Sequence, residues 1–410
     1  MKILMLAGGY DQIDLIKELQ SRGHEVILMD YMENPPAKEY VEKHFQISTL
    51  DENAVYQLAV REKIELVTTV CTDQALPVAA KVSERLGLPF YLSSSTAQNI
   101  TNKTLMKRKF NEYAVPSAGW IILEENNRSV GEIERNWKFP LVVKPCDANS
   151  SKGVTKVGDS ESLAKAVDNA FEISRDKKVI VENYMEGEEI SIDVWKGVEG
   201  VKVLLVSGTN KIRTQEGYFA IYQSRYPIEL SETVKIRIQD IAERICKAFE
   251  LENTPLLIQA VVNGDEISVI ECSARIGGGT KHKLIQHITG IDIMSIYADR
   301  ILGNRVQNLT VNSCAKKVEL NYVYGNCGVF QKLVGFQERV ASGDIVDVFQ
   351  YKKPGSEICK RTTSSDRILG FMIEADTCEE LQQKRYEILE TIDVLDGNGK
   401  SMIYKECFYQ

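Results

Sequence analysis

Short apolar runs alternate with helix-length segments through the first hundred residues, and this alternation constrains the fold most strongly. Residues 13–23 carry apolar side chains at helical spacing and end at a glycine. Strands that alternate with helices in this way predict a parallel sheet covered on both faces. We therefore expect a doubly wound α/β domain over residues 1–95. The expected strands are residues 2–8, 24–30, 64–70 and 88–92.

The turn after the first expected strand does not fit a dinucleotide-binding motif. Asp30 lies about twenty residues beyond Gly8, where a ribose-binding acid would lie. However, residues 7–12 read AGGYDQ, which lacks the G-x-G-x-x-G pattern. We interpret the segment as a tight connection between strand and helix.

Composition excludes several classes of protein. The 410 residues include 50 Lys and Arg and 58 Asp and Glu, giving a net charge of −8, which argues against a nucleic-acid partner held by bulk charge. No apolar run approaches the ~18 residues of a membrane span, and the first residues lack the basic region of a secretion signal. The nine cysteines lack any CxxC spacing and the four histidines lack HExxH, so we expect reduced thiols, no zinc site and a cytoplasmic protein without a membrane partner.

The chain changes character after about residue 95. Residues 95–98 (STAQ) resemble a capping box that opens one long helix to Tyr113. Strand candidates then follow one another closely, which indicates antiparallel pairing. The turn Asn263-Gly264-Asp265 predicts a hairpin within residues 255–275. A region of strands and glycines begins near residue 315.

Two lysines lie close to a small flexible turn. Lys144 ends the apolar run FPLVVKP, and Lys152 lies in the following turn SSKGV. Lysines and the backbone N–H groups of such a turn can hold phosphate oxygens. The alternative is a solvent-exposed hairpin, which this segment alone does not exclude.

Carboxylates flank Gly187 at the junction of two expected strands. Glu182 and Glu189 could accept hydrogen bonds from an adenine amino group and from ribose hydroxyls. A solvated acidic turn is the better interpretation of this segment taken alone.

The stretch from Asp265 to Gly279 is the most informative. Period-two alternation places Glu271, Ser273 and Arg275 on one face of a strand that leads into three glycines, and Gln259 on the preceding strand can join that face. An acid, two polar groups and an arginine beside a glycine turn suit Mg²⁺ and a transferring phosphoryl group. The alternative is an amphipathic edge strand.

The order of these segments resembles the ATP-grasp superfamily, in particular its carboxylate–amine ligases. The motifs that carry the resemblance are Asn102-Lys103, FPLVVKP, SSKGV, VENYMEGEEISIDV and VIECSARIGGG, followed by a C-terminal β-rich part. Biotin carboxylase, the glycinamide ribonucleotide enzymes and the L-amino-acid ligases belong to this group. The resemblance implies an N-terminal α/β domain, a central two-subdomain ATP-grasp fold and a C-terminal α+β domain. The implied boundaries are 1–95, 96–185, 186–314 and 315–410.

The resemblance implies a role for each matching residue. Lys103 and Lys144 would contact ATP phosphates, and Arg275 would stabilise the phosphoryl group and the acyl phosphate, so Arg275 and Lys144 are the expected catalytic residues. Glu271 would bind Mg²⁺, with Mn²⁺ as an alternative. The remaining implied ATP contacts are Ser151, Lys152 and Gly153 in a mobile turn, Glu182 with the backbone of Asn183 and Tyr184 at adenine, and Glu189 at ribose.

The sequence departs from the family pattern at the expected metal site. Gln259 replaces the usual metal-binding glutamate, and Ser273 replaces the usual asparagine. Both side chains offer neutral oxygens, which are weaker ligands for a hard dication. We expect one of two ions to bind weakly or to arrive with ATP.

The resemblance implies an ADP-forming ligase that joins a small-molecule carboxylate and an amine through an acyl phosphate, acting on amino acids or similar small acids. A glycinamide ribonucleotide ligase or formyltransferase-like enzyme and a non-catalytic ATP-binding module are the alternatives. A homodimer is common in the family. The candidate substrate contacts are Arg225, Arg213, Asp73 and Gly278.

Overall fold

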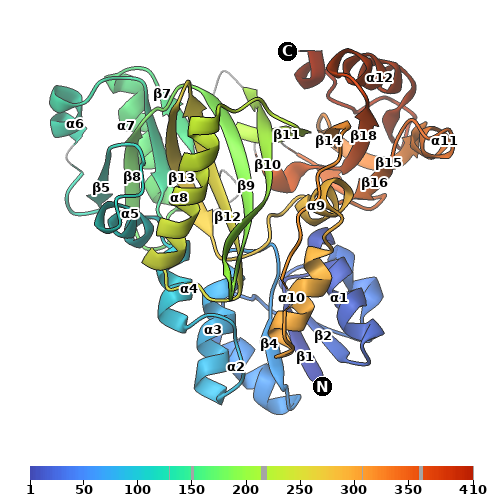
Figure 1. Ribbon diagram of the computed structural model, residues 1–410, viewed down its shortest axis with the longest axis horizontal. Coiled ribbons are helices and arrows are strands. Elements are labelled where there is room, and N and C mark those ends of the chain that lie inside the picture. Colours follow the sequence, from blue (N-terminus) through green and yellow to red (C-terminus); the bar gives the residue numbers. More distant parts are fainter. Residues whose placement is uncertain (129, 149–151, 214–218, 307, 360–362, 410) are drawn as a thin grey trace.

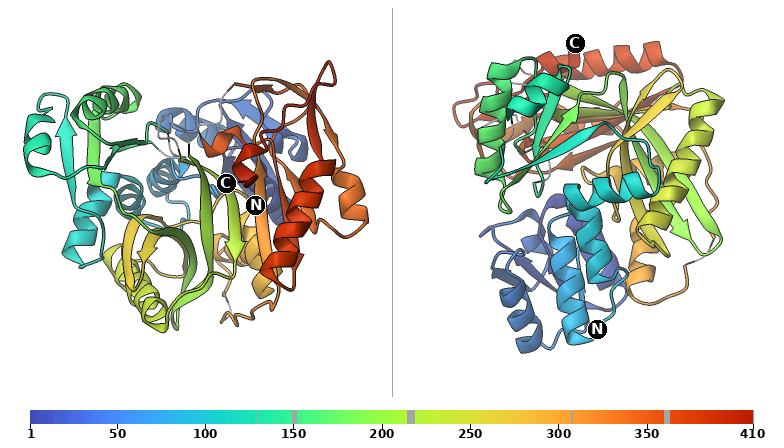
Figure 2. Two further views of the ribbon diagram at one scale, coloured as in Figure 1. Left: turned by 90° about the horizontal axis from the view of Figure 1, so that it is seen from above. Right: turned by 90° about the vertical axis from the view of Figure 1, so that its left-hand side faces the viewer.

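The computed structural model shows an α/β N-terminal unit beneath a set of antiparallel sheets (Figure 1; Figure 2, right). It describes residues 1–128, 130–148, 152–213, 219–306, 308–359 and 363–409. In this part of the chain, no helix is both long and apolar enough to cross a lipid bilayer.

The N-terminal unit contains the parallel sheet that the sequence predicted. Its strand order is β3-β2-β1-β4, and every pairing is parallel. After β1, Ala7 takes a positive φ of 74°, and the Gly8 N–H donates to Asp30 at 2.7 Å. Asp30 therefore fixes the turn, as expected for a tight connection. The elements are β1 (Lys2–Leu6), α1 (Tyr10–Ser21), β2 (Glu25–Asp30), the 3₁₀ helix η1 (Pro36–Tyr40), β3 (Lys43–Gln46), α2 (Glu52–Arg61), β4 (Leu66–Thr68) and α3 (Ala75–Leu86).

Two local predictions for this half of the chain are wrong. Residues 88–92 form no strand, because Tyr91 and Leu92 pack into the core and the Tyr91 hydroxyl donates to the Ala274 carbonyl at 2.9 Å. The long helix to Tyr113 is two helices, α4 (Ser94–Thr101) and α5 (Lys103–Glu112). Ser93 rather than Ser95 caps the first helix, its side chain accepting from Thr96 N.

A small antiparallel sheet follows, with strand order β5-β8-β6-β7. Its apolar face packs against α6 and α7 in a core of its own, which includes Leu141, Phe171 and Val181. The elements are β5 (Trp120–Glu124), α6 (Val130–Asn136), β6 (Leu141–Pro145), β7 (Thr155–Val157), α7 (Ser160–Ile173) and β8 (Lys178–Asn183).

The largest sheet has eight antiparallel strands in the order β13-β12-β9-β10-β11-β14-β18-β16. The pairing of β11 with β14 carries this sheet across residue 314, where we placed a domain boundary. The four-domain division itself stays a prediction. The strands are β9 (Glu188–Gly197), β10 (Gly200–Arg213), β11 (Phe219–Tyr226), β12 (Thr254–Asn263), β13 (Glu266–Ser273), β14 (Lys317–Val323), β16 (Asp347–Gln350) and β18 (Leu369–Ala375).

A three-stranded sheet of order β17-β15-β19 completes the C-terminal part. The connection between β13 and β14 of the large sheet packs α10 beside α1 (Figure 1), and Arg22 pairs there with Asp299 at 2.6 Å. The remaining elements are α8 (Glu232–Ala248), α9 (Lys281–Thr289), α10 (Ile293–Ile301), β15 (Gly328–Val334), α11 (Phe336–Ala341), β17 (Glu357–Ile358), the 3₁₀ helix η2 (Ser364–Asp366), α12 (Cys378–Thr391), β19 (Asp393–Asp396) and the 3₁₀ helix η3 (Glu406–Tyr409).

Candidate active site

A cleft of about 1370 Å³ lies where the N-terminal unit, the small sheet and the large sheet meet. It gathers most of the residues singled out from the sequence. Gly153 and Ser273 do not line it, Ser151 lies outside the described residues, and so does the side chain of Arg213, whose backbone ends β10. The expected residues that line the cleft are Lys103, Lys144, Lys152, Glu182, Asn183, Tyr184, Glu189, Gln259, Glu271, Arg275, Arg225, Asp73 and Gly278.

Glu182 is held between two lysines at one end of the cleft. Lys144, on β6, is hydrogen-bonded to one carboxylate oxygen, and Lys107, on α5, lies 2.8 Å from the other. Burial alone would raise the pKa of Glu182, but the two ammonium groups together lower it to about 2. The same carboxylate raises the pKa of Lys144 against the opposing effect of burial. Glu182 is therefore ionised. Its single negative charge balances one of the two lysines, so the cluster of Glu182, Lys107 and Lys144 has a net charge of +1.

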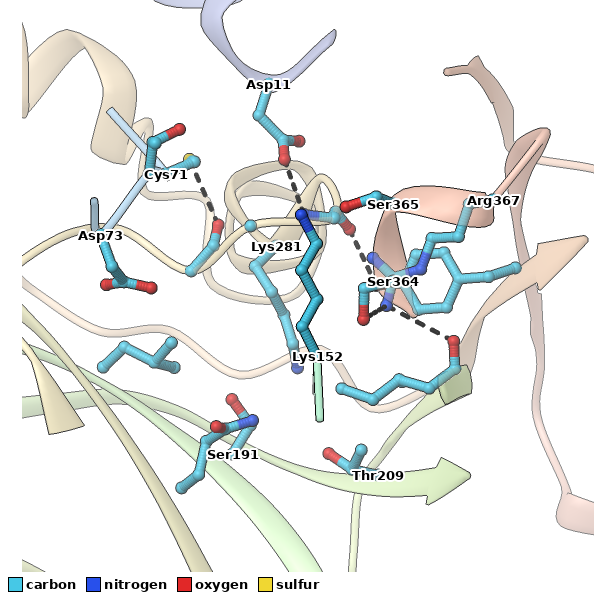
Figure 3. A pocket seen from close by; sticks show the side chains of 18 of the residues that line it. Asp11, Cys71, Asp73, Lys152, Ser191, Thr209, Lys281, Ser364, Ser365 and Arg367 are labelled. Carbon is cyan, nitrogen blue, oxygen red and sulfur yellow. Dashed lines mark hydrogen bonds between the residues drawn. The ribbon is translucent and has the colours of Figure 1, made fainter. Parts of the chain in front are cut away.

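Lys103 is the first residue of α5, directly after the break that separates α4 from α5. Asn102 has extended backbone angles, and its side chain accepts from Thr104 N and Leu105 N. The Lys103 ammonium donates to the Ala148 carbonyl at 2.5 Å and lies 3.7 Å from Glu271. A third ammonium, that of Lys152, reaches the same cleft (Figure 3). Lys103 and Lys144 make this end of the cleft suitable for a polyanion, and Lys152 lies nearer to Asp11 and Arg367 (Figure 3).

The turn beyond Lys152 requires glycine. Gly153 has a φ of 71°, and a Cβ there would lie 2.8 Å from side-chain atoms of both Pro145 and Ile173.

The connection after β8 offers a flat, partly aromatic wall. The Tyr184 ring lines the cleft beneath the Lys156 ammonium, 3.5 Å from its centroid. The backbone N–H groups of Asn183 and Tyr184 already donate to Gly119 and Pro140 carbonyls, at 3.0 and 3.2 Å. These two N–H groups are thus engaged within the protein.

The acidic residues of β9 are paired with cations across the sheet. Glu189 lies 2.7 Å from Lys211, and Glu188 lies 2.7 Å from Arg225. The Arg225 guanidinium therefore lies in the cleft, but it already forms an ion pair with Glu188.

Gln259 and Glu271 lie directly opposite each other on β12 and β13. Opposed residues of an antiparallel pair have Cβ atoms about 5 Å apart, so both side-chain oxygens can reach one ion. Among the described residues, no three His, Cys, Asp or Glu side chains cluster as a metal site. One carboxylate and one amide oxygen fit a single Mg²⁺ that takes its other ligands from phosphate and water, and they do not fit two ions held by protein alone.

Arg275 is clamped by a carboxylate from the N-terminal unit. Asp73, just beyond β4, accepts from Arg275 Nε at 2.7 Å and from Nη2 at 2.5 Å, and it also accepts from the Ser273 hydroxyl. Burial disfavours the charge on Asp73, but Arg275 holds the pKa of Asp73 below its ordinary value. Ser273 thus bonds to Asp73 at the expected second metal position.

The three glycines after Arg275 approach side chains of both flanking units. Asp11 accepts from Gly279 N at 2.8 Å and from Thr280 N at 2.7 Å, and a Cβ at Gly279 would lie 2.3 Å from Arg367 Nη1 (Figure 3). The Tyr322 hydroxyl donates to the Gly279 carbonyl at 2.8 Å. At Gly279 the glycine turn therefore permits a close approach of the backbone to the protein's own residues.

Comparisons with known proteins agree with this geometry. The family model "D-ala D-ala ligase C-terminus" matches residues 110–280. A formate-dependent phosphoribosylglycinamide formyltransferase from Histophilus somni (strain 129Pt) is 28% identical over 280 residues, 67% of this chain and 69% of that protein. The L-amino acid ligase from Bacillus licheniformis superposes with a TM-score of 0.78 at 20% identity, covering 97% and 99% of the two chains. Phosphoribosylglycinamide synthetase from Anaerococcus prevotii gives 0.73 at 19% identity, covering 96% and 99%.

The whole chain has the ATP-grasp fold, and residues 110–280 match a family of ligases.

Sequence analysis did not identify three residues that line this ATP-grasp cleft, Asp11, Lys281 and Arg367, or Lys107, which contacts the cleft residue Glu182. Asp11 was read only as part of a turn, and Lys281 and Arg367 lie in segments without a recognisable motif. Lys107 follows Lys103 by one helical turn, and this spacing was the available signal. Burial distinguishes these cations from ordinary surface lysines and arginines, and burial is a property of the fold.

Proposed function

We propose that this ATP-grasp enzyme joins a small carboxylic acid, such as an amino acid, to an amine, with ATP converted to ADP and phosphate. The single observation that supports this most strongly is the convergence of Lys103, Lys144 and Lys152 with Glu271 and Arg275 on one cleft. Such a site positions a polyphosphate and stabilises a transferring phosphoryl group, and these two tasks account for most phosphoryl-transfer catalysis.

Binding of the nucleotide follows from the charges of the cleft. The lysines would meet the phosphate oxygens, and Glu182 with the Tyr184 wall would meet the base. Glu271 and Gln259 would hold a magnesium ion, which supplies neutralisation of the phosphate charge when bound. Arg275 lines the cleft, held by Asp73 and by a hydrogen bond from its Nη1 to the Ile276 carbonyl at 2.9 Å.

The reaction then needs two displacements. A carboxylate oxygen attacks the terminal phosphorus of ATP, the bond to ADP breaks, and an acyl phosphate forms. The amine nitrogen next attacks the acyl carbon, loses a proton and expels inorganic phosphate, leaving an amide. The Arg275 guanidinium would stabilise the negative charge on the phosphoryl group in both steps.

The cysteines of this region do not suit a thiolate mechanism. Burial raises the pKa of both Cys71 and Cys272 well above the ordinary value. The Cys71 thiol also donates to the Gly277 carbonyl at 3.4 Å. A buried thiol with a raised pKa is a poor nucleophile, which supports direct attack by substrate groups.

The test combines Mg-ATP with pools of small acids and amines. We expect ADP release together with a product whose mass equals acid plus amine minus water. Lys144→Met and Glu271→Gln should each lower ADP formation at least about a hundredfold. Lys165→Met removes an exposed lysine of α7 and should leave the rate unchanged. Full activity of both cleft variants would refute the assignment of the site.

A second candidate function is ligation or formylation of a phosphoribosyl amine. The far end of the cleft is lined by groups that suit a phosphate: Lys352, Lys353, Ser364, Ser365 and Arg367. Arg367 is 7% exposed, stacks 3.7 Å from the Tyr322 ring centroid and forms no ion pair with a carboxylate among the described residues. The formyltransferase relative acts on such a phosphoribosyl compound, as its name states.

A panel of phosphoribosyl amines, with formate as the acid, separates the two candidates. Turnover with the phosphoribosyl amines alone would establish the second function. Turnover with simple amino acids alone would establish the first.

A further inference from the structure

The two lysines that contact Glu182, Lys107 and Lys144, lie at different positions relative to the cleft. Lys144 and Glu182 line the cleft, whereas Lys107 lies behind them and does not line it. Lys107 is 2% exposed, and its ammonium lies 3.5 Å from the Val269 carbonyl of β13 in addition to its contact with Glu182. A ligand in the cleft can therefore draw Lys144 away from Glu182 while Lys107 stays in place.

We propose that Lys107 is a positioning residue that remains paired with Glu182 and so frees Lys144 to bind phosphate oxygens of the ligand. This inference rests on the proposed function, because it assumes that a nucleotide phosphate binds beside Lys144. It assigns different tasks to two lysines that contact the same carboxylate.

The physical reason is the charge balance of a buried cluster. Without Lys107, movement of Lys144 toward phosphate would leave the Glu182 carboxylate buried and unpaired, which is costly unless it takes up a proton. Glu271 on β13 and Glu189 on β9 are the other charged groups that act on the two lysines. Both are acidic, so neither can replace Lys107 as the partner of Glu182.

The experiment uses magnesium tripolyphosphate, because this probe lacks a base and reports only on the phosphate end. Its Kd is measured by titration calorimetry at pH 6 and pH 8 for wild type, Lys107→Met, Lys107→Arg, Glu182→Gln and the double variant Lys107→Met/Glu182→Gln. We expect Lys107→Met to bind about tenfold more weakly at pH 8, and by a smaller factor at pH 6, where Glu182 can be protonated. The double variant should recover wild-type affinity, since a neutral glutamine needs no cation.

The outcomes distinguish this inference from a structural role and from the proposed function. Wild-type affinity in Lys107→Met overturns the inference, as does an equal loss at both pH values without recovery in the double variant. If Lys107→Met does not fold, the double variant and Lys107→Arg decide the question. Weak binding by the double variant overturns the inference, and wild-type affinity in both of these variants supports it. If the wild type binds neither ATP nor tripolyphosphate, the proposed function itself is overturned.

Two exposed cysteines carry an independent inference. Cys327 and Cys359 take the next register position beyond the pairs Val329–Glu357 and Gly328–Ile358 of β15 and β17. Phe330 N donates to the Ser356 carbonyl at 2.9 Å, so alternation along the ladder makes Cys327 and Cys359 a non-hydrogen-bonded pair. Such pairs have Cα atoms about 4.5 Å apart, within the range of a disulfide. The Cys327 sulfur lies 2.7 Å from the Cys359 carbonyl oxygen.

The geometry points to a reversible disulfide between Cys327 and Cys359 that fixes the wall of the cleft formed by residues 351–356. Oxidised glutathione can serve as the oxidant: the two thiols lose two protons and two electrons, one S–S bond forms, and two molecules of reduced glutathione leave. Tyr351 at the start of this wall is hydrogen-bonded to Thr280 at 2.8 Å, and Lys353 pairs with Glu39 at 2.7 Å. The disulfide would therefore act on a segment that joins the glycine turn to the N-terminal unit.

Oxidation of the full chain tests this assignment. We expect mass spectrometry to show one cross-linked peptide that contains Cys327 and Cys359, released by dithiothreitol and absent from Cys327→Ser. Cys378→Ser, which removes another exposed thiol at the start of α12, should leave the cross-link in place. Recovery of Cys327 and Cys359 only as separate glutathione adducts would overturn the assignment. The KM for the acceptor should shift in oxidised wild type only; an unchanged KM despite the cross-link would refute its effect on the cleft.

Discussion

Asp73 controls the direction in which Arg275 presents its charge. Its two oxygens take the Nε and Nη2 groups of Arg275, at 2.7 and 2.5 Å. Replacement by asparagine removes the charge and one acceptor, so the guanidinium can rotate. We expect Asp73→Asn to lower kcat about tenfold to a hundredfold with an ATP KM within about twofold of wild type, measured by steady-state ADP release.

Asp14 offers a matched control for this change. It pairs with His282 at 2.7 Å and with Lys283 at 2.8 Å, and it does not line the cleft. Asp14→Asn breaks a comparable ion pair, and kcat should remain near the wild-type value. Equal losses in both variants would show that Asp73 acts on stability and not on Arg275.

Glu182 also makes stability depend on pH in the acid range. Its pKa is about 2 in the folded protein against an ordinary value of 4.5, so its contribution is present above pH 4.5 and disappears as the pH falls toward 2. The contribution is of order 3 kcal/mol at neutral pH. We expect Glu182→Gln to be less stable than wild type at pH 7, and the difference in urea unfolding free energy to shrink at pH 3. A difference that stays constant with pH would contradict this.

At the scale of elements, the break between α4 and α5 determines where Lys103 points. The Asn102 side chain accepts from two N–H groups of the first turn of α5, and Lys103 follows at once. We expect Asn102→Ala to cost about 1 kcal/mol of stability and to raise the KM for ATP several-fold, because the start of α5 frays.

Asp51 provides the comparison for this cap. Its side chain accepts from Ala54 N at the start of α2, remote from the cleft. Asp51→Ala should cost a similar free energy in thermal unfolding and leave the KM for ATP unchanged. A raised KM in both variants would mean that loss of stability alone weakens nucleotide binding.

The same break shows where sequence reasoning about elements succeeds and fails. Periodicity predicted the parallel N-terminal strands and the 255–275 hairpin because both depend on local pattern. It could not separate α4 from α5, since residue 102 interrupts the helix through its backbone angles and not through a proline or glycine. It also assigned residues 88–92 to a strand because an apolar connector that packs on the core has the same composition as a buried strand.

At the scale of the whole molecule, the cleft combines segments that are far apart in sequence. The sequence predicted that Gln259 could share a strand face with Glu271, and the hairpin register places the two residues opposite each other. The contacts of Asp73 with Arg275 and of Lys107 with Glu182 join elements that are far apart in the sequence, and they could be read only from the fold. The sequence therefore predicted the chemical groups better than it predicted their partners.

The buried apolar clusters separate the small sheet from the rest of the molecule. The N-terminal unit and the large sheet share a continuous apolar core, whereas the small sheet packs with α6 and α7 in a separate core. Lys144 on β6 and Lys152 line the cleft from the small-sheet side, and Glu271 on β13 and Arg275 line it from the large-sheet side. A ligand that bridges the two sides should restrict the small sheet more than the rest.

Hydrogen exchange measured by mass spectrometry tests this division. We expect Mg-ATP to slow amide exchange in β6, β7 and β8, because lysines of that side would be held by phosphate, while β1 and β2 exchange as in the free protein. AMP, which lacks the outer phosphates, should protect β7 less than ATP does, and Lys144→Met should lose that difference. Equal protection of β1 and the small sheet would show that the chain closes as one body, and the separate core would then have no mechanical consequence.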